Sequence, residues 1–131
     1  MRGVRPLQKV TTGDFGRATE ARFTLDASLH GLLVSRPEGD APGYDRIVDN
    51  GKRLFRVQVK GVTRSLYGKK SYSVNINRHG RKPPTFDEVA VWLDGEARWV
   101  FLPARVRRMK MVRIAPSGKH SRRGWDVFAR R

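Results

Sequence analysis

The chain has 131 residues, 38% of them hydrophobic, and its 28 Lys and Arg against 12 Asp and Glu give a formal net charge of +16. The length predicts one compact domain, and the charge predicts a polyanionic partner, nucleic acid above all. The lack of cysteine excludes disulfides, thiol nucleophiles and cysteine-based zinc sites, and no apolar run approaches the ~20 residues of a transmembrane helix.

A basic leader precedes a segment with the pattern of an amphipathic helix, at residues 14–30. Thr12-Gly13-Asp14 offers helix-capping chemistry, and Gly31 offers a C-terminal stop. Apolar residues recur at spacings of three and four, namely Ala18, Ala21, Leu25, Leu29 and Leu32. We expect this stripe to pack on a sheet, with Glu20 beside it and within reach of the sheet.

Two extended segments joined by a turn predict an antiparallel pair of strands. A short extended segment at 32–34 and a loop at 35–43 come first. Residues 44–48 are extended in character, and Asp49-Asn50-Gly51 is a hairpin turn signal. In residues 54–61 apolar and polar side chains then alternate. This period of two predicts a half-buried strand beside the first.

The second half of the chain predicts further strands and a basic end. Residues 72–77 alternate again, and 78–85 form a basic loop. Residues 87–93 and 97–102 predict a hairpin in which Asp94-Gly95 supplies the positive-φ turn positions. Residues 106–114 fit either helix or strand, and the tail 117–131 is rich in arginine. This order predicts an α/β or α+β sheet with the first helix packed on one face.

Four polar residues are expected to share one site. Side chains two apart on a strand project from the same face, about 6.6 to 6.8 Å apart, so Gln58 and Lys60 point into one space. Asp45 comes close if its strand pairs with theirs, and Glu20 approaches from the helix. Carboxylate and amide oxygens suit Mg²⁺, which polarises a phosphoryl group and activates water. Lys60 would orient that water or help deprotonate it, and would offset charge on the pentacovalent state.

This order of residues resembles the core of the PD-(D/E)XK nucleases, the restriction-endonuclease-like fold. The likeness runs from Glu20 through PEGDAPGYD, which ends at Asp45, to Gln58-Val59-Lys60, and continues along 86–103. It covers residues 13–103. Gln-X-Lys in place of Glu-X-Lys or Asp-X-Lys is similar to the cyanobacterial group I intron homing endonuclease. Archaeal-type Holliday junction resolvases share the core but have an acid at the Gln58 position.

The resemblance implies one nuclease domain over residues 1–131, with a core at 13–103 and a basic C-terminal extension at 104–131. The implied fold is a mixed central β-sheet flanked by helices. The implied activity is that of a Mg²⁺-dependent DNA endonuclease, with Mn²⁺ as a substitute, acting on double-stranded or branched DNA as a homodimer or homotetramer. The catalytic residues would be Glu20, Asp45, Gln58 and Lys60, and the metal ligands Asp45, Gln58 and Glu20. Because Gln58 keeps a carbonyl oxygen but removes one negative charge, we expect weaker metal binding than at an all-acid site.

Basic residues outside this set are expected to contact DNA phosphates, which positions DNA without reading its sequence. They are Arg17, Arg56, Lys69, Lys70, Arg78, Arg81, Lys82, Arg122 and Arg123. Trp125 in the tail is a candidate for base or sugar contact. Since the start of the chain lacks the apolar segment of a secretory signal, we expect a cytoplasmic or nucleoid-associated protein.

Simpler interpretations stand beside each of these hypotheses. Lys60 can be a solvated strand residue, Asp45 can cap a turn, and Glu20 can pair with Arg17. The whole chain can be a non-catalytic nucleic-acid-binding protein that uses the same basic surface.

Overall fold

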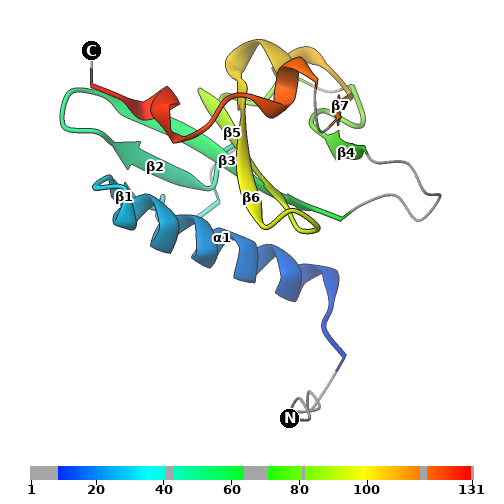
Figure 1. Cartoon of the computed structure of the whole chain (residues 1–131), viewed down its shortest axis with the longest axis horizontal. Helices are drawn as coiled ribbons and strands as arrows, with labels where there is room; N and C mark the ends of the chain where they lie inside the picture. Colours follow the sequence, from blue (N-terminus) through cyan, green and yellow to red (C-terminus); the bar gives the residue numbers. More distant parts are fainter. Residues whose placement is uncertain (1–8, 41–42, 64–70, 81, 116–117, 131) are drawn as a thin grey trace.

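Helix α1 (Thr12–Leu29) lies across one face of a five-stranded sheet (Figure 1). The computed structural model describes residues 9–40, 43–63, 71–80, 82–115 and 118–130. Thr11 caps the helix by accepting a hydrogen bond from the Asp14 N–H, and the Asp14 side chain accepts one from the Thr11 N–H. This reciprocal capping fixes the start of α1 at Thr12, two residues before the predicted start at residue 14.

The sheet is mixed, which confirms the predicted α/β class. Its strand order is β1-β2-β3-β5-β6. Strands β2 and β3 are antiparallel, β3 and β5 are parallel, and β5 and β6 are antiparallel. The bounds are β1 Leu33–Ser35, β2 Arg46–Asp49, β3 Leu54–Val62, β5 Glu88–Leu93 and β6 Arg98–Pro103. The predicted hairpin around Asp49-Asn50-Gly51 is therefore present as β2 and β3.

A second, two-stranded sheet forms away from α1 (Figure 1). It pairs β4 (Tyr72–Asn75) with β7 (Met111–Ile114), antiparallel. The ambiguous segment 106–114 thus contains the end of a 3₁₀ helix, η1 (Ala104–Arg108), followed by a strand. Two further 3₁₀ helices, η2 (Lys119–Ser121) and η3 (Trp125–Phe128), follow β7.

Apolar side chains cover the main sheet on both faces. On the α1 side, Phe23 and Ala27 of the helix pack with Val57 and Val59 of β3. On the other side, Val89 and Val91 of β5 pack with the residues of β4 and β7. Every residue of β5 is consequently buried, as a central strand between two layers requires.

The face that α1 buries differs from the predicted stripe. Thr19, Phe23 and Ala27 are buried, whereas Leu25 and Leu29 are 60% and 76% exposed, and Ala18 and Ala21 are exposed too. The reason lies in β3: a Cβ on Gly61 would stand 2.6 Å from Phe15 Cε1 and 2.8 Å from Thr19 Oγ1. The glycine lets this face of the helix approach the strand closely, and Phe23 fills the core beyond it.

The turn between β5 and β6 also differs from the prediction. Leu93 pairs with Arg98, so four residues form the loop. The Glu96 N–H donates to the Leu93 carbonyl over 3.0 Å, and Ala97 has the positive φ, at 51°. A two-residue primed turn would need positive φ at Asp94 and Gly95, but this longer loop needs it only at its last residue.

The segment that follows β6 takes part in both cores. Val106, Val112 and Ile114 are buried on the side away from α1, and Phe128 is buried on the α1 side. The Trp125 ring stacks on Phe23 with centroids 5.6 Å apart. Trp125 is thus a packing residue of this core.

None of the described helices has the length and the apolar composition of a membrane-spanning helix.

Candidate active site

The site is built where β2 parts from β3. The last paired residues of the two strands in this direction are Arg46 and Val57. Just before β2, the Asp45 N–H donates to the Val57 carbonyl over 2.9 Å. The Asp45 carboxylate then accepts the Val59 N–H at Oδ2, also over 2.9 Å. Past Arg46 and Val57, β2 no longer pairs with β3, and we call this stretch of the strand the open edge of β3. There the Asp45 carboxylate accepts the N–H that a neighbouring strand would otherwise accept.

Gln58 and Lys60 stand on either side of Val59. Val57 and Val59 face α1, so strand alternation turns Gln58 and Lys60 to the opposite face, and they pair in register with Val89 and Val91. Both side chains are half-buried. Gln58 Oε1 is fully buried and has no hydrogen-bond partner within the described residues. A buried amide oxygen without a donor is costly, and a ligand that needs an oxygen would satisfy it.

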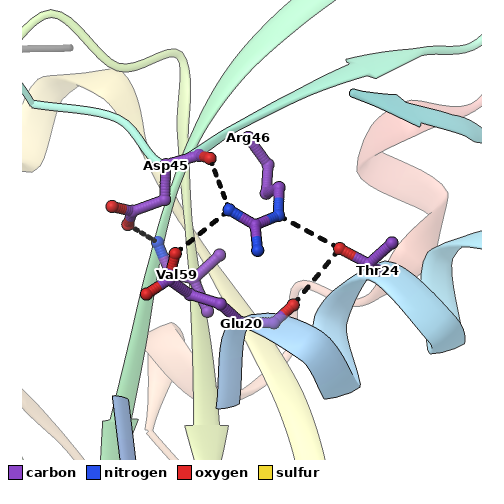
Figure 2. A network of polar contacts seen from close by, with 5 residues as sticks. All are labelled: Glu20, Thr24, Asp45, Arg46 and Val59. Atoms are coloured by element: carbon purple, nitrogen blue, oxygen red, sulfur yellow. Dashed lines mark hydrogen bonds and ion pairs between the residues drawn. The ribbon is translucent and has the colours of Figure 1, made fainter. Parts of the chain in front are cut away.

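Glu20 reaches the same edge from the other side, through an arginine (Figure 2). Arg46 donates from one terminal nitrogen to Glu20 Oε1 over 3.0 Å and to the Asp45 carbonyl over 2.8 Å. Its Nε donates to Thr24 Oγ1 over 3.1 Å. The Arg46 side chain is only 12% exposed. One guanidinium thus joins α1 to the start of β2.

Asp45 belongs both to the contacts with α1 and to the open edge of β3. It lines a cavity of about 620 Å³ together with Glu20, Arg46 and the loop 36–40. It also holds the N–H that lies between Gln58 and Lys60. The structure brings Glu20 and Asp45 to one cavity, and brings Asp45 to the edge of β3 that carries Gln58 and Lys60.

The alternative pairing of Glu20 with Arg17 is wrong. Arg17 forms its ion pair with Asp14, and Glu20 forms its ion pair with Arg46. Arg46 is the site residue that the sequence interpretation missed. A signal was present: Arg46 has the same parity as Val48, which faces the core, and a cation on a core-facing parity requires a buried partner.

Comparison with known proteins shows the family of the chain. The sequence model of the PD-(D/E)XK endonuclease family matches residues 10–124. The chain belongs to the PD-(D/E)XK endonuclease family. This confirms the resemblance found in the sequence. The curated proteins contain no match to the chain.

Among the solved structures that share the fold of this chain are a homing endonuclease and a Holliday junction resolvase. A bacterial homing endonuclease, I-Ssp6803I, aligns with a TM-score of 0.71 and 21% identity, over 91% of this chain and 86% of that one. Hjc, a Holliday junction resolvase of the archaeal hyperthermophile Archaeoglobus fulgidus, aligns with a TM-score of 0.51 and 21% identity. That alignment covers 79% of this chain and 85% of the resolvase.

PD-(D/E)XK nucleases generally use divalent metal ions. The residues at the open edge of β3 fit such an ion. Asp45 supplies a carboxylate, and Gln58 supplies the buried oxygen that lacks a donor. Among the described residues, no three His, Cys, Asp or Glu side chains are grouped to hold a metal. The oxygen ligands that these two residues offer are one carboxylate and one amide.

The predicted DNA contacts fall into three groups in this PD-(D/E)XK protein. Arg78, Lys82 and Arg122 are exposed. Three others are paired with carboxylates: Arg17 with Asp14, Arg56 with Asp87 at 3.4 Å, and Arg123 with the buried Glu88 at 2.9 Å. Lys69, Lys70 and Arg81 lie outside the described residues.

The Glu88–Arg123 pair ties the C-terminal segment to β5. Burial raises the pKa of the Glu88 carboxyl, and the neighbouring Arg123 partly counters that rise. The Arg123 carbonyl also accepts the Phe101 N–H over 3.0 Å. Arg123 therefore holds the C-terminal segment against β5 and β6.

Proposed function

We propose that this PD-(D/E)XK protein is a Mg²⁺-dependent DNA endonuclease that hydrolyses phosphodiester bonds at the open edge of β3. The observation that carries the proposal is the 2.9 Å hydrogen bond from the Val59 N–H to Asp45 Oδ2. It holds a carboxylate beside the two residues, Gln58 and Lys60, that project from one face of the strand. The share of the chain that aligns with I-Ssp6803I, 91%, supports a homing-type enzyme within the family.

Each residue of the proposed site has a separate task. A bound Mg²⁺ would supply Lewis acidity toward the phosphoryl group and its attacking water. Asp45 and Gln58 would hold that ion by oxygen, with Glu20 contributing from α1. Lys60 would orient the attacking water and offset the negative charge that develops at phosphorus. Arg46 would keep Glu20 in place and lower the repulsion between the two carboxylates.

Two further properties belong to the proposal. Cutting both strands of duplex DNA calls for two sites, so we propose a homodimer or homotetramer. The exposed Leu25 and Leu29 of α1 offer apolar surface for such an assembly. Sedimentation analysis that finds only monomers, with and without DNA, would contradict this part.

Plasmid cleavage tests the enzymatic proposal. Supercoiled plasmid and a four-way junction are incubated with Mg²⁺ or with EDTA. We expect nicking or cutting by the wild-type protein in Mg²⁺ only, and its loss in Lys60→Ala. Lys119→Ala is the matched control, because Lys119 is exposed on η2 and its change removes the same charge. Cleavage by Lys60→Ala at the wild-type rate would refute the role of Lys60.

The second candidate is a non-catalytic DNA-binding protein, and the specific observation that favours it is Gln58. The amide removes one negative charge from the metal site, as a decayed active site would. Retention of both DNAs without cleavage, in Mg²⁺ and in Mn²⁺, would support the binding protein over the enzyme. A junction that is cut in preference to linear duplex would instead support resolvase-like activity.

A further inference from the structure

A second cavity, of about 520 Å³, lies between the β2–β3 turn and the C-terminal segment. Figure 1 shows the red C-terminal segment running back to this turn. Arg53 and Arg122 line the cavity, and Asp126 also lines it. Arg123 is present too, but its guanidinium is paired with Glu88.

The walls of this cavity are fixed by polar contacts. Asn50 is buried, and its Nδ2 donates to the Phe128 carbonyl over 2.9 Å. Asn50 Oδ1 accepts the Arg53 N–H over 2.8 Å, and the Asn50 carbonyl accepts Arg130 Nε over 2.6 Å. Gly51 has a φ of 91°, and a Cβ there would collide with the Arg130 guanidinium. The turn and the tail therefore form one preorganised unit.

Among the described residues, Arg53 and Arg122 form no ion pair. The Arg53 guanidinium lies over the Phe55 ring, 4.2 Å from its centroid, which keeps the charge at the surface in one orientation. Arg122 is exposed. A planar guanidinium placed this way suits the oxygens of a phosphate group.

We infer that this cavity binds a backbone phosphate of duplex DNA at a distance from the cleavage site. Arg53 precedes Val59 by six positions, which corresponds to about 20 Å along an extended strand. At about 3.4 Å per base pair, that span is about six base pairs of duplex, more than half a helical turn. The cavity is thus a second contact, separate from the open edge of β3. The inference rests on the proposed function, because DNA is the ligand in both.

DNA affinity measured without metal tests the inference. Arg53→Gln combined with Arg122→Gln removes two charges from the cavity and keeps part of each side-chain stem. Arg105→Gln combined with Arg107→Gln removes two charges from exposed positions of η1 and serves as the control. Fluorescence anisotropy with a labelled duplex is recorded at several salt concentrations, after circular dichroism has confirmed that both variants fold.

We expect the cavity variant to bind about tenfold more weakly and its log–log salt slope to be shallower by about 1, since the loss of one phosphate contact removes about 0.9. The control should change by less than half as much. If wild type and control bind while the cavity variant keeps the wild-type affinity and slope, the inference fails and the proposed function stands. If the wild-type protein does not bind duplex DNA at all, the proposed function itself fails.

A chemical cross-link gives a second readout. The natural chain has no cysteine, so Arg122→Cys introduces a single thiol. With a duplex that carries a thiol tether on a backbone phosphate, we expect efficient disulfide formation by Arg122→Cys and little by Arg107→Cys. Equal cross-linking by the two variants would overturn the inference.

Discussion

At the scale of single residues, Arg46 ties the Glu20 carboxylate to the backbone of Asp45. Its guanidinium contacts Glu20, Thr24 and the Asp45 carbonyl from a nearly buried position. Removing one partner of such a set leaves the others without their bonds, and Glu20 would then be free to move away from Asp45. In the proposed site Arg46 is a positioning residue, because it acts through the Glu20 carboxylate and the Asp45 backbone.

Arg46→Gln should therefore lower the cleavage rate at saturating DNA at least about tenfold while leaving DNA affinity unchanged. Unfolding free energy should fall by about 1.5–3 kcal/mol, the range for hydrogen bonds to charged groups. Single-turnover kinetics, anisotropy and urea denaturation measure the three quantities. Thr24→Val is the control, since it removes the Nε contact and the Thr24 Oγ1 bond to the Glu20 carbonyl but leaves the Arg46–Glu20 ion pair. A variant with wild-type rate and lowered stability would assign Arg46 a structural role alone.

The sequence was sufficient to predict that Gln58 and Lys60 share one face of β3 and that Asp45 lies beside this strand. The Asp49-Asn50-Gly51 turn fixes the register of β2 against β3, and alternation fixes the faces. The Arg46–Glu20 pair was not predicted, because a helix–strand contact depends on how α1 is rotated over the sheet. Local patterns did not indicate that rotation correctly.

At the scale of elements, Gly61 sets the distance between α1 and β3. A Cβ there would lie 2.6 Å from the Phe15 ring and 2.8 Å from Thr19 Oγ1, both on the helix. This contact explains why the exposed leucines of α1 were a misleading guide to its buried face. Leu25 and Leu29 are more hydrophobic than Thr19 and Ala27. The side of the helix that carries Thr19 nevertheless faces the sheet, because it is the side that packs against Gly61.

Gly61→Ala should destabilise the fold by about 1–3 kcal/mol, the usual cost of overpacking a tight contact. Gly16→Ala is the matched control, because the position is helical and a Cβ added there would have no neighbour within 4 Å among the described residues. That change should stabilise by about 0.5–1 kcal/mol. Urea denaturation of both variants measures the difference. Equal effects of the two changes would contradict the close approach of α1 to β3.

The Glu88–Arg123 contact between β5 and the C-terminal segment makes the stability of the fold depend on pH. Burial raises the pKa of Glu88 from its ordinary value of 4.5 in the folded state. A raised pKa means that the folded state binds the proton more tightly than the unfolded state. The stability linked to this proton is complete below the ordinary pKa and is lost as pH rises through the folded-state pKa.

Glu88→Gln does not titrate, so the variant should gain stability relative to the wild type as pH rises from about 4 to about 7. Glu38→Gln, at an exposed position, should show no such trend. Urea denaturation at a series of pH values measures the differences. A relative gain as pH falls would mean that pairing with Arg123 outweighs burial.

At the scale of the whole molecule, the net charge is +16, and the proposed site contains two acids, Glu20 and Asp45. Such a surface attracts DNA regardless of sequence, and its effect weakens with salt. Several of the acids are paired: Glu20 with Arg46, Asp14 with Arg17 and Glu88 with Arg123. Asp45 instead accepts a backbone N–H, and it is the acid best placed to meet a cation at the open edge of β3.

We propose that Asp45 and Gln58 together hold a divalent ion, and calorimetric titration of the DNA-free protein with Mg²⁺ measures this binding. We predict that Asp45→Asn binds at least about tenfold more weakly than wild type, since lost outer contacts alone cost that much. Gln58→Glu should bind at least as tightly as wild type. Asp40→Asn, an exposed carboxylate of the same cavity, should behave as wild type. Unchanged binding in Asp45→Asn, or weaker binding in Gln58→Glu, would contradict the claim.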